Sequence, residues 1–193
     1  MFVSQGDGRQ IMQRTTRYVM NRKTDLDIMA SLATGTQYIG TSATTMTLGM
    51  ATRARVALGI NQVPIQEEDN MFAVISPAAM GYLLETKEFN SSAFVEVKPL
   101  NGPARRFRRW MGFNWIEHPL VPGIGTASET IFFYHRYAVG HAVNTGEMQA
   151  LAGYHEEQDY SWARTTAYMG SVVLQNRGII LARHDGSQYT TTA

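Results

Sequence analysis

The first part of the chain has a helical pattern of apolar and polar positions. From Arg9 to Ala33 there is neither proline nor glycine, and Asp7 is suited to cap the first turn. Apolar or small side chains recur on one side of this segment, at Ile11, Thr15, Tyr18, Met29 and Leu32. The pattern predicts one long helix that stops at Gly35, carries charges on its remaining surface and lies across a sheet.

Two shorter helices and a buried strand are predicted next. Apolar positions have helical spacing from Met46 to Leu58, and the apolar run Phe72 to Ile75 is typical of a buried strand. Ser76 and Pro77 follow directly. Serine at the N-cap and proline at the first helical position favour a new helix there.

The residues from Trp162 to Leu174, near the C-terminus, are predicted to form a strand, because Thr, Tyr, Val and Trp suit a pleated surface. Gln175 to Gly178 has turn chemistry, and Ile179 to Leu181 is a short apolar run, so the pattern predicts a hairpin. We take as a hypothesis that Trp162 lies in the core. Trp162→Ala would then cost about 3–5 kcal/mol, whereas a loss below about 1 kcal/mol would place the side chain on an exposed face.

Further strands are expected between the predicted helices and this hairpin. They are Phe94 to Val97, Gly112 to Ile116, Thr130 to Val143 (a strand, then a short helix or second strand) and Gly146 to Tyr154. The strands form two groups, residues 72–75 with 113–142, and residues 148–181. The predicted fold class is α+β, with one long helix, two shorter helices and a mainly antiparallel sheet system in two lobes.

Composition favours a globular protein with some surface turned toward protein. The chain is 44% hydrophobic and only 17% charged, and its net charge of +1 produces no global field toward nucleic acid or membrane. Fourteen arginines against three lysines favour interfaces slightly, although a codon-usage bias explains the ratio equally well. The absence of cysteine excludes disulfides and thiolate chemistry. Without a signal-like start or a spanning apolar run, synthesis inside the cell and no membrane contact are expected.

No motif for catalysis or for a cofactor is present. The five histidines fit no zinc spacing, and neither GxSxG nor SxxK occurs. Gly123-Ile124-Gly125 lacks the third glycine of a dinucleotide fingerprint, so a turn is the better interpretation. We therefore expect no enzyme activity, no catalytic residue, no metal site and no cofactor.

The segment Arg105 to Trp110 interleaves four arginines with two aromatic residues. It fits either a nucleic-acid grip with base stacking or a protein interface in which arginines meet a neighbour's acidic runs. The near-neutral total charge, with acidic clusters elsewhere in the chain, favours protein contact. The candidate subunit-interface residues are Arg14, Arg17, Arg105, Arg106, Arg108, Arg109, Trp110, Glu67, Glu68, Asp69, Glu156 and Glu157.

Several segments, taken in order, are similar to one known family. They are Tyr18, Arg22, Asp25, Ile28 and Leu32; Val63-Pro64, Asp69 and 72–77; 111–116 (MGFNWI); 133–142 (FYHRYAVGHA); and Trp162, Met169, Gly170, Val172, Val173 and Gly178. Their order and spacing, from about Arg9 to His184, resemble the major capsid proteins of tailed bacteriophages, which have the Hong Kong 97-like fold.

The resemblance implies a long spine helix packed on a mainly antiparallel sheet, with a second, mixed α/β axial lobe. It assigns residues 1–44 and 147–193 to a peripheral domain and residues 45–146 to an axial domain. Because Met1 stands almost directly before the spine helix, the family's N-terminal arm and extended loop are expected to be absent, together with cross-linking through that loop.

The function implied is that of a structural protein that self-assembles into hexamers and pentamers of an icosahedral shell around double-stranded DNA, with no sequence-specific DNA contact. Scaffolding, portal and decoration proteins are the further partners implied. The expected location is the virion, after assembly in the host cytoplasm.

Overall fold

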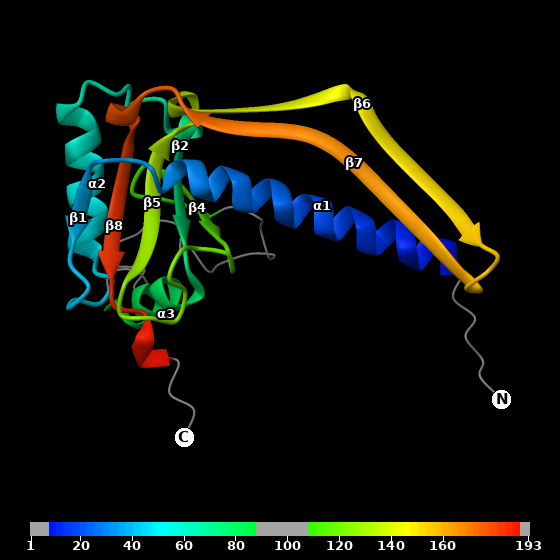
Figure 1. Cartoon of the computed structure of the whole chain (residues 1–193). Helices are drawn as coiled ribbons and strands as arrows, with labels where there is room; N and C mark the ends of the chain where they lie inside the picture. The colour runs from blue at the N-terminus through cyan, green and yellow to red at the C-terminus, as the bar shows by residue number, and fades with distance from the viewer. Residues whose placement is uncertain (1–7, 88–107, 190–193) are drawn as a thin grey trace. The chain divides into compact units, whose positions relative to one another are not determined.

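The computed structural model describes residues 8–87 and 108–189 (Figure 1). The chain divides into two compact units. Unit 1 consists of Met1–Ile28 and His141–Ser171, and unit 2 consists of Met29–Gly140 and Val172–Ala193. The first helix, α1 (Gly8–Leu32), begins in unit 1 and ends in unit 2, and it confirms the long helix predicted from the sequence.

Unit 2 is built on a six-stranded mixed sheet in the order β1-β8-β5-β2-β4-β3 (Figure 1). Its strands are β1 (Tyr38–Gly40), β2 (Met71–Ile75), β3 (Arg108–Trp110), β4 (Phe113–Glu117), β5 (Glu129–His135) and β8 (Ile179–His184). The pairs β1–β8 and β2–β4 are parallel, and the other three pairs are antiparallel. The helices α2 (Leu48–Ile60) and α3 (Pro77–Glu85) complete an α+β fold.

The core of unit 2 lies on its central strands. Phe133 of β5 meets Phe113 and Trp115 of β4 edge-on, with ring centroids 5.2 and 5.8 Å apart. These three side chains are almost completely buried. Edge-to-face pairs add about 0.5–1.5 kcal/mol each to the stabilisation from burial alone. The apolar run predicted as a buried strand, Phe72 to Ile75, is confirmed as β2 at the centre of the sheet.

The start of α3 confirms the predicted helix signal. Ser76 is the N-cap, its Oγ accepts a hydrogen bond from the Ala79 N–H at 3.0 Å, and Pro77 is the first helical residue. The second predicted helix is α2, which begins and ends two residues later than the pattern indicated. Of the other predicted strands, 112–116 is confirmed as β4, and Phe94 to Val97 lies outside the described residues.

The predicted C-terminal hairpin is wrong, although its two strands and its turn exist. The turn is η3 (Asn176–Gly178), a short 3-10 helix, but β7 (Tyr160–Val173) pairs with β6 (Val139–His155), whereas β8 lies between β1 and β5. Ile179, Ile180 and Leu181 are buried, so β8 needs cover on both faces, which only a central strand of the sheet has. The predicted grouping of residues 148–181 is also wrong, because β8 lies in the same sheet as β2, β4 and β5, whereas β6 and β7 form a separate sheet.

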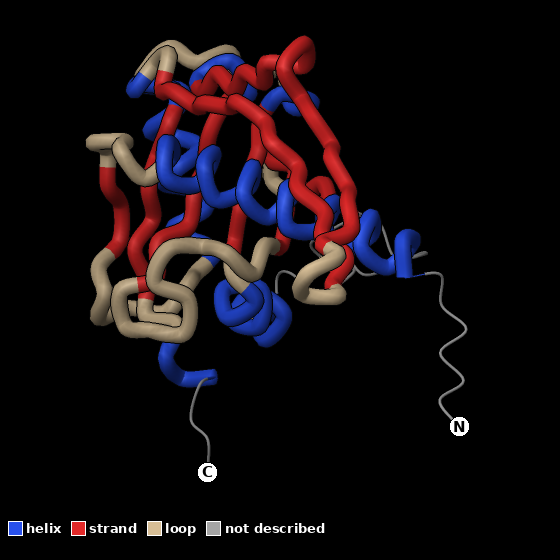
Figure 2. Tube along the Cα trace, turned by 45° about the vertical axis from the view of Figure 1, so that its right-hand side comes forward, coloured by secondary structure: helices blue, strands red, loops and turns tan. Residues whose placement is uncertain are grey.

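Unit 1 consists of the first 21 described residues of α1 and a long two-stranded ribbon. The ribbon is β6 paired with β7, and the two strands run side by side in Figures 1 and 2. The strand predicted at residues 146–154 and the end of the one predicted at 130–143 are therefore parts of one strand, β6, which is separated from β5 by η2 (Arg136–Ala138).

The position of Trp162 gives a direct test of the ribbon. Trp162 is 38% exposed, so the hypothesis that it lies in the core is wrong. We expect Trp162→Ala to lower the free energy of unfolding by less than about 1 kcal/mol in urea denaturation. Trp115→Ala is the matched control and is expected to cost about 3–5 kcal/mol, because Trp115 is buried and its Nε1 donates to the Trp110 carbonyl at 2.8 Å. Equal losses in the two variants would contradict this assignment.

Candidate subunit interface

The described residues of unit 1 form no hydrophobic core of their own. Every buried hydrophobic side chain of the described residues belongs to unit 2. Eleven large apolar side chains of unit 1 are instead exposed, whereas Met12, Met20, Ile28 and Met169 are half-buried. The exposed ones are Ile11, Tyr18, Val19, Leu26, Val143, Met148, Leu151, Tyr154, Tyr160, Trp162 and Tyr168. An isolated two-stranded ribbon is marginal in water, and a lone helix gains most of its stability from packing. Apolar surface of this extent is typical of a protein interface.

Polar contacts join the helix to the ribbon inside unit 1, and a ring contact joins the two strands of the ribbon. Ser171 Oγ of β7 donates to Asp27 Oδ2 of α1 at 2.5 Å, and His141 Nδ1 of β6 lies 2.8 Å from the same Oγ. At the far end of the ribbon, the rings of His155 and Tyr160 stack with centroids 5.4 Å apart. These contacts fix the partners of the ribbon without removing its apolar side chains from water.

The charged interface candidates of unit 1 lie on two separate elements. Arg14 and Arg17 are exposed on α1, where Arg14 Nε donates to the Tyr18 hydroxyl at 3.3 Å. Together with Gln13 they line a shallow hollow of about 510 Å³. Glu156 and Glu157 are exposed in the turn between β6 and β7. Unit 1 therefore presents a basic helix and an acidic turn.

The acidic run Glu67 to Asp69 in unit 2 already has basic neighbours in its own chain. Glu68 and Asp69 begin η1 (Glu68–Asn70), a single 3-10 turn before β2. Asp69 pairs with Arg109, Glu68 lies 3.8 Å from Arg55, and Glu67 lies 3.8 Å from the Nε2 of His135. Exposed pairs of this kind contribute about 0–1 kcal/mol each. The two arginines therefore offset two of the three negative charges of this run.

Asn114 organises this charged region, and the sequence analysis did not identify it. Its side chain is 5% exposed, and its Nδ2 donates to the carbonyls of Glu68 and Met71 at 2.8 and 2.9 Å. Its Oδ1 accepts from Arg109 Nε at 3.1 Å. One amide thus holds η1 and the start of β2 against β4. The available signal was a single polar residue inside the apolar run GFNWI.

The Arg-aromatic segment is described only in part. Arg105, Arg106 and Phe107 lie outside the described residues, and Arg108 to Trp110 form β3 at the edge of the sheet. A two-residue turn with positive φ at Met111 (51°) and Gly112 (74°) joins β3 to β4, as is typical of a type I′ hairpin. The Trp110 ring lies 5.9 Å from that of Trp115, so Trp110 packs at the margin of the core, whereas Arg109 is exposed.

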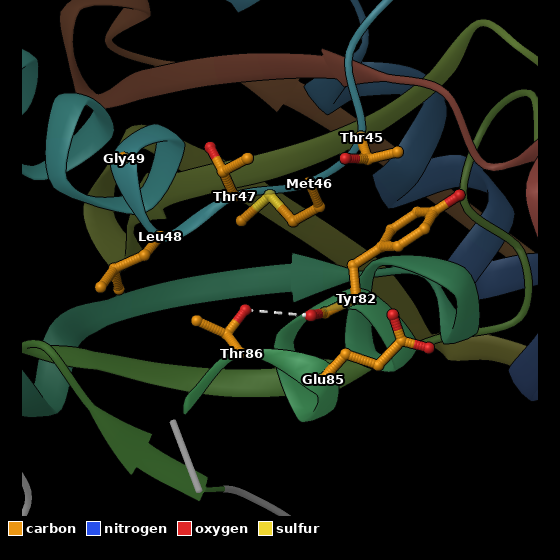
Figure 3. A pocket seen from close by; sticks show the side chains of 8 residues that line it. All are labelled: Thr45, Met46, Thr47, Leu48, Gly49, Tyr82, Glu85 and Thr86. Carbon is orange, nitrogen blue, oxygen red and sulfur yellow. Dashed lines mark hydrogen bonds between the residues drawn. The ribbon is translucent and has the colours of Figure 1, made fainter. Parts of the chain in front are cut away.

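One further hollow, of about 420 Å³, opens between the start of α2 and the end of α3 (Figure 3). Thr86 Oγ1 donates to the Tyr82 carbonyl there at 3.1 Å, and the Glu85 carboxylate lies beside them (Figure 3). Within the ranges that the structure describes, His, Asp and Glu form no group of three that would hold a metal ion. No helix in those ranges has the length and apolar character needed to cross a membrane.

Comparison with known proteins gives one family and one fold. The family model described as phage capsid protein matches residues 4–185. Among solved structures, the chain is similar to one from Mycobacterium phage Che8, with 14% identity and a TM-score of 0.71, covering 89% of this chain and 61% of that one.

Two further structures have the same fold. The capsid of the empty GTA particle has 15% identity and a TM-score of 0.67, covering 95% of this chain and 68% of that one. The SrpI encapsulin of Synechococcus elongatus PCC 7942 has 15% identity and a TM-score of 0.62, covering 100% and 71%. The chain spans less than two thirds of the length of the chain from Mycobacterium phage Che8. No curated protein sequence matches it.

Proposed function

Because the chain belongs to the phage capsid protein family, we propose that it is a major capsid protein whose copies assemble into hexamers and pentamers of an icosahedral shell around double-stranded DNA. The single observation that supports assembly most strongly is the lack of any buried hydrophobic side chain in the described part of unit 1. A unit of that kind gains its stability by burying apolar area against other copies, at about 25 cal/mol per Å².

In this proposal the protein is structural and resides in the virion. Unit 1 contains most of the residues that the resemblance assigns to the peripheral domain, and unit 2 contains most of the axial domain. Scaffolding, portal and decoration proteins, and DNA held without sequence-specific contact, stay predictions. So does assembly in the host cytoplasm.

We further propose that opposite charges of unit 1 meet between copies. The exposed turn with Glu156 and Glu157 on one copy faces the exposed Arg14 and Arg17 of the next. Head-to-tail contacts between unlike patches form rings when the repeated rotation closes on itself, and open filaments when it does not. Complementary charges mainly determine which surfaces meet and how fast they meet.

A charge exchange tests this pairing. Replacing both Glu156 and Glu157 by Arg places like charges together and is expected to weaken association at least about tenfold, as is replacing Arg14 and Arg17 by Glu. Combining the four changes restores the attraction, so association should recover toward the original value. Sedimentation velocity over a concentration series measures all three variants. Additive losses in the combined variant would show that the two patches do not face each other.

The alternative function, nucleic-acid binding through Arg105 to Trp110, has its own test. It predicts binding that falls steeply with salt and that is lost when Arg105, Arg106, Arg108 and Arg109 are all changed to Glu. If the chain is a shell subunit, Arg105→Glu with Arg109→Glu is expected to weaken assembly and to lower the melting temperature only slightly, because the pair of Arg109 with Asp69 that it breaks is exposed. Unchanged DNA affinity in the fourfold variant excludes the alternative. Loss of folding in the double variant would instead mean that these arginines act within the chain.

A further inference from the structure

A buried acid–base pair lies at one end of the central sheet. Glu129 begins β5, His184 ends β8, and the two residues are direct partners in the antiparallel register. Both are 0% exposed, and Glu129 Oε2 is 3.5 Å from His184 Nε2. An ionisable pair in the interior is costly unless its net charge is balanced.

The surroundings of the pair favour its neutral forms. Burial raises the pKa of Glu129, and Asp185 adds to this rise, whereas the Ser76 side chain and the Gly125 backbone oppose it. Burial lowers the pKa of His184, against the opposing effect of the backbone and charge of Asp185. The remaining titratable group beside the pair is Tyr82 of α3, whose ring meets His184 edge-on at 6.4 Å.

The C-terminal segment Asp185–Tyr189 covers this pair. A methyl group at position 186 would overlap the Glu129 carboxylate, so Gly186 lies directly against it. The Asp185 N–H donates to the Thr44 carbonyl at 2.8 Å, and the Gly186 N–H donates to the Thr126 carbonyl at 3.0 Å.

Tyr189 then anchors the end of the segment on α3. Its hydroxyl donates to Glu85 Oε1 at 2.8 Å, and its ring lies 4.8 Å from that of Tyr82. Water therefore reaches the Glu129–His184 pair when this short segment lifts.

We infer that Glu129 and His184 form a one-proton latch: the pair holds segment 185–189 on unit 2, and the two residues together bind a single proton whether the segment is closed or open. While the segment is closed, one proton on the pair leaves no net charge in the interior. When it opens, water restores the ordinary pKa values, 4.5 for the carboxyl and 6.5 for the imidazole. Between those values the open pair also binds one proton, which is on His184.

The sign of the pH dependence follows from proton counting. A raised pKa of Glu129 in the closed state means that opening becomes easier as pH rises above 4.5. A lowered pKa of His184 means that opening becomes easier as pH falls below 6.5. Because the two effects are opposite and overlap between these values, the closed segment keeps nearly constant stability over that window.

Hydrogen exchange at the amides of Asp185 and Gly186 in the full chain, corrected for intrinsic rates, measures the opening. We expect the opening constant to change less than about threefold between pH 4.5 and 6.5 in the original chain. In Glu129→Gln it should increase by up to about tenfold for each unit that pH falls, and in His184→Asn by up to about tenfold for each unit that pH rises. The control Tyr189→Phe removes the hydrogen bond to Glu85 and should raise the opening constant by the same factor at every pH.

Two results would overturn the latch. One is a steep pH dependence in the original chain, and the other is the same flat profile in both single variants. If either single variant fails to fold, the pH dependence of opening is measured in the original chain and in the double variant Glu129→Gln/His184→Asn, and these two profiles test the inference. The double variant has no proton to exchange at this site, so it must open independently of pH, as the original chain does. A slope in either of them contradicts the inference.

Discussion

Changing Tyr18 and Tyr168 together to Asp is expected to lower the association constant of the protein by about 1,000-fold or more, while the sheet of unit 2 keeps its stability. Each tyrosine is 59% exposed in the single chain, one on α1 and one on β7. An aromatic anchor buried on assembly contributes about 2 kcal/mol or more, and two such losses correspond to about three orders of magnitude. Sedimentation velocity measures the association constant, and urea unfolding measures the stability.

The matched control replaces both tyrosines by Phe. Phenylalanine keeps the apolar ring and removes only the hydroxyl, so this variant is expected to assemble. An aspartate variant that associates as well as the original chain would show that this surface stays in water. Loss of assembly in the phenylalanine variant as well would show that the hydroxyl groups, and not the buried apolar area, hold the copies together.

Asn114→Asp is expected to lower the free energy of unfolding by about 3–5 kcal/mol at neutral pH. The substitution replaces two N–H donors by a carboxylate oxygen that faces the carbonyls of Glu68 and Met71, in a site that is 5% exposed. A buried carboxylate whose one cationic neighbour, Arg109, lies largely in solvent destabilises the fold, and so do the two orphaned carbonyls. Arg109 offsets little of this loss, because its guanidinium lies largely in solvent.

Urea unfolding of Asn114→Asp at several pH values tests both the size of the stability loss and its cause, the buried carboxylate. Burial raises the pKa of the new carboxyl above its unfolded value of about 3.9. The loss of stability is therefore small in acid and grows as pH rises through that range. Asn70→Ala is the control, since its side chain bonds Glu67 in an exposed position, and it is expected to cost below about 1 kcal/mol. A loss of less than 1 kcal/mol for Asn114→Asp would contradict the role assigned to Asn114.

Elements that depend on neighbouring residues were predictable from the sequence. The long helix needed only an uninterrupted helical pattern, and α3 needed only the sequence Ser76-Pro77 before an apolar stripe. The family resemblance was also predictable, because its motifs occur in order along the chain. The family match over residues 4–185 confirms it.

Strand pairing was not predictable, because it depends on distant partners. The turn at Asn176–Gly178 suggested a hairpin, but Ile179 to Leu181 gain more by entering the sheet between β1 and β5. The β-favouring residues around Trp162 correctly predict a strand, yet residue types alone do not say whether either face of the strand is covered by the same chain. The pair of Arg109 with Asp69 joins residues 40 positions apart, which no local pattern indicates.

The central claim is that copies of this chain supply the cover that unit 1 lacks. Hydrogen exchange of the β6 and β7 amides, followed over a series of protein concentrations, tests it most directly. We predict that these amides exchange at least about 100-fold faster in dilute, dissociated protein than in the assembled form, while the amides of β2 and β5 keep the same protection throughout. Ribbon amides that are as protected as the sheet in a dilute monomer would contradict it.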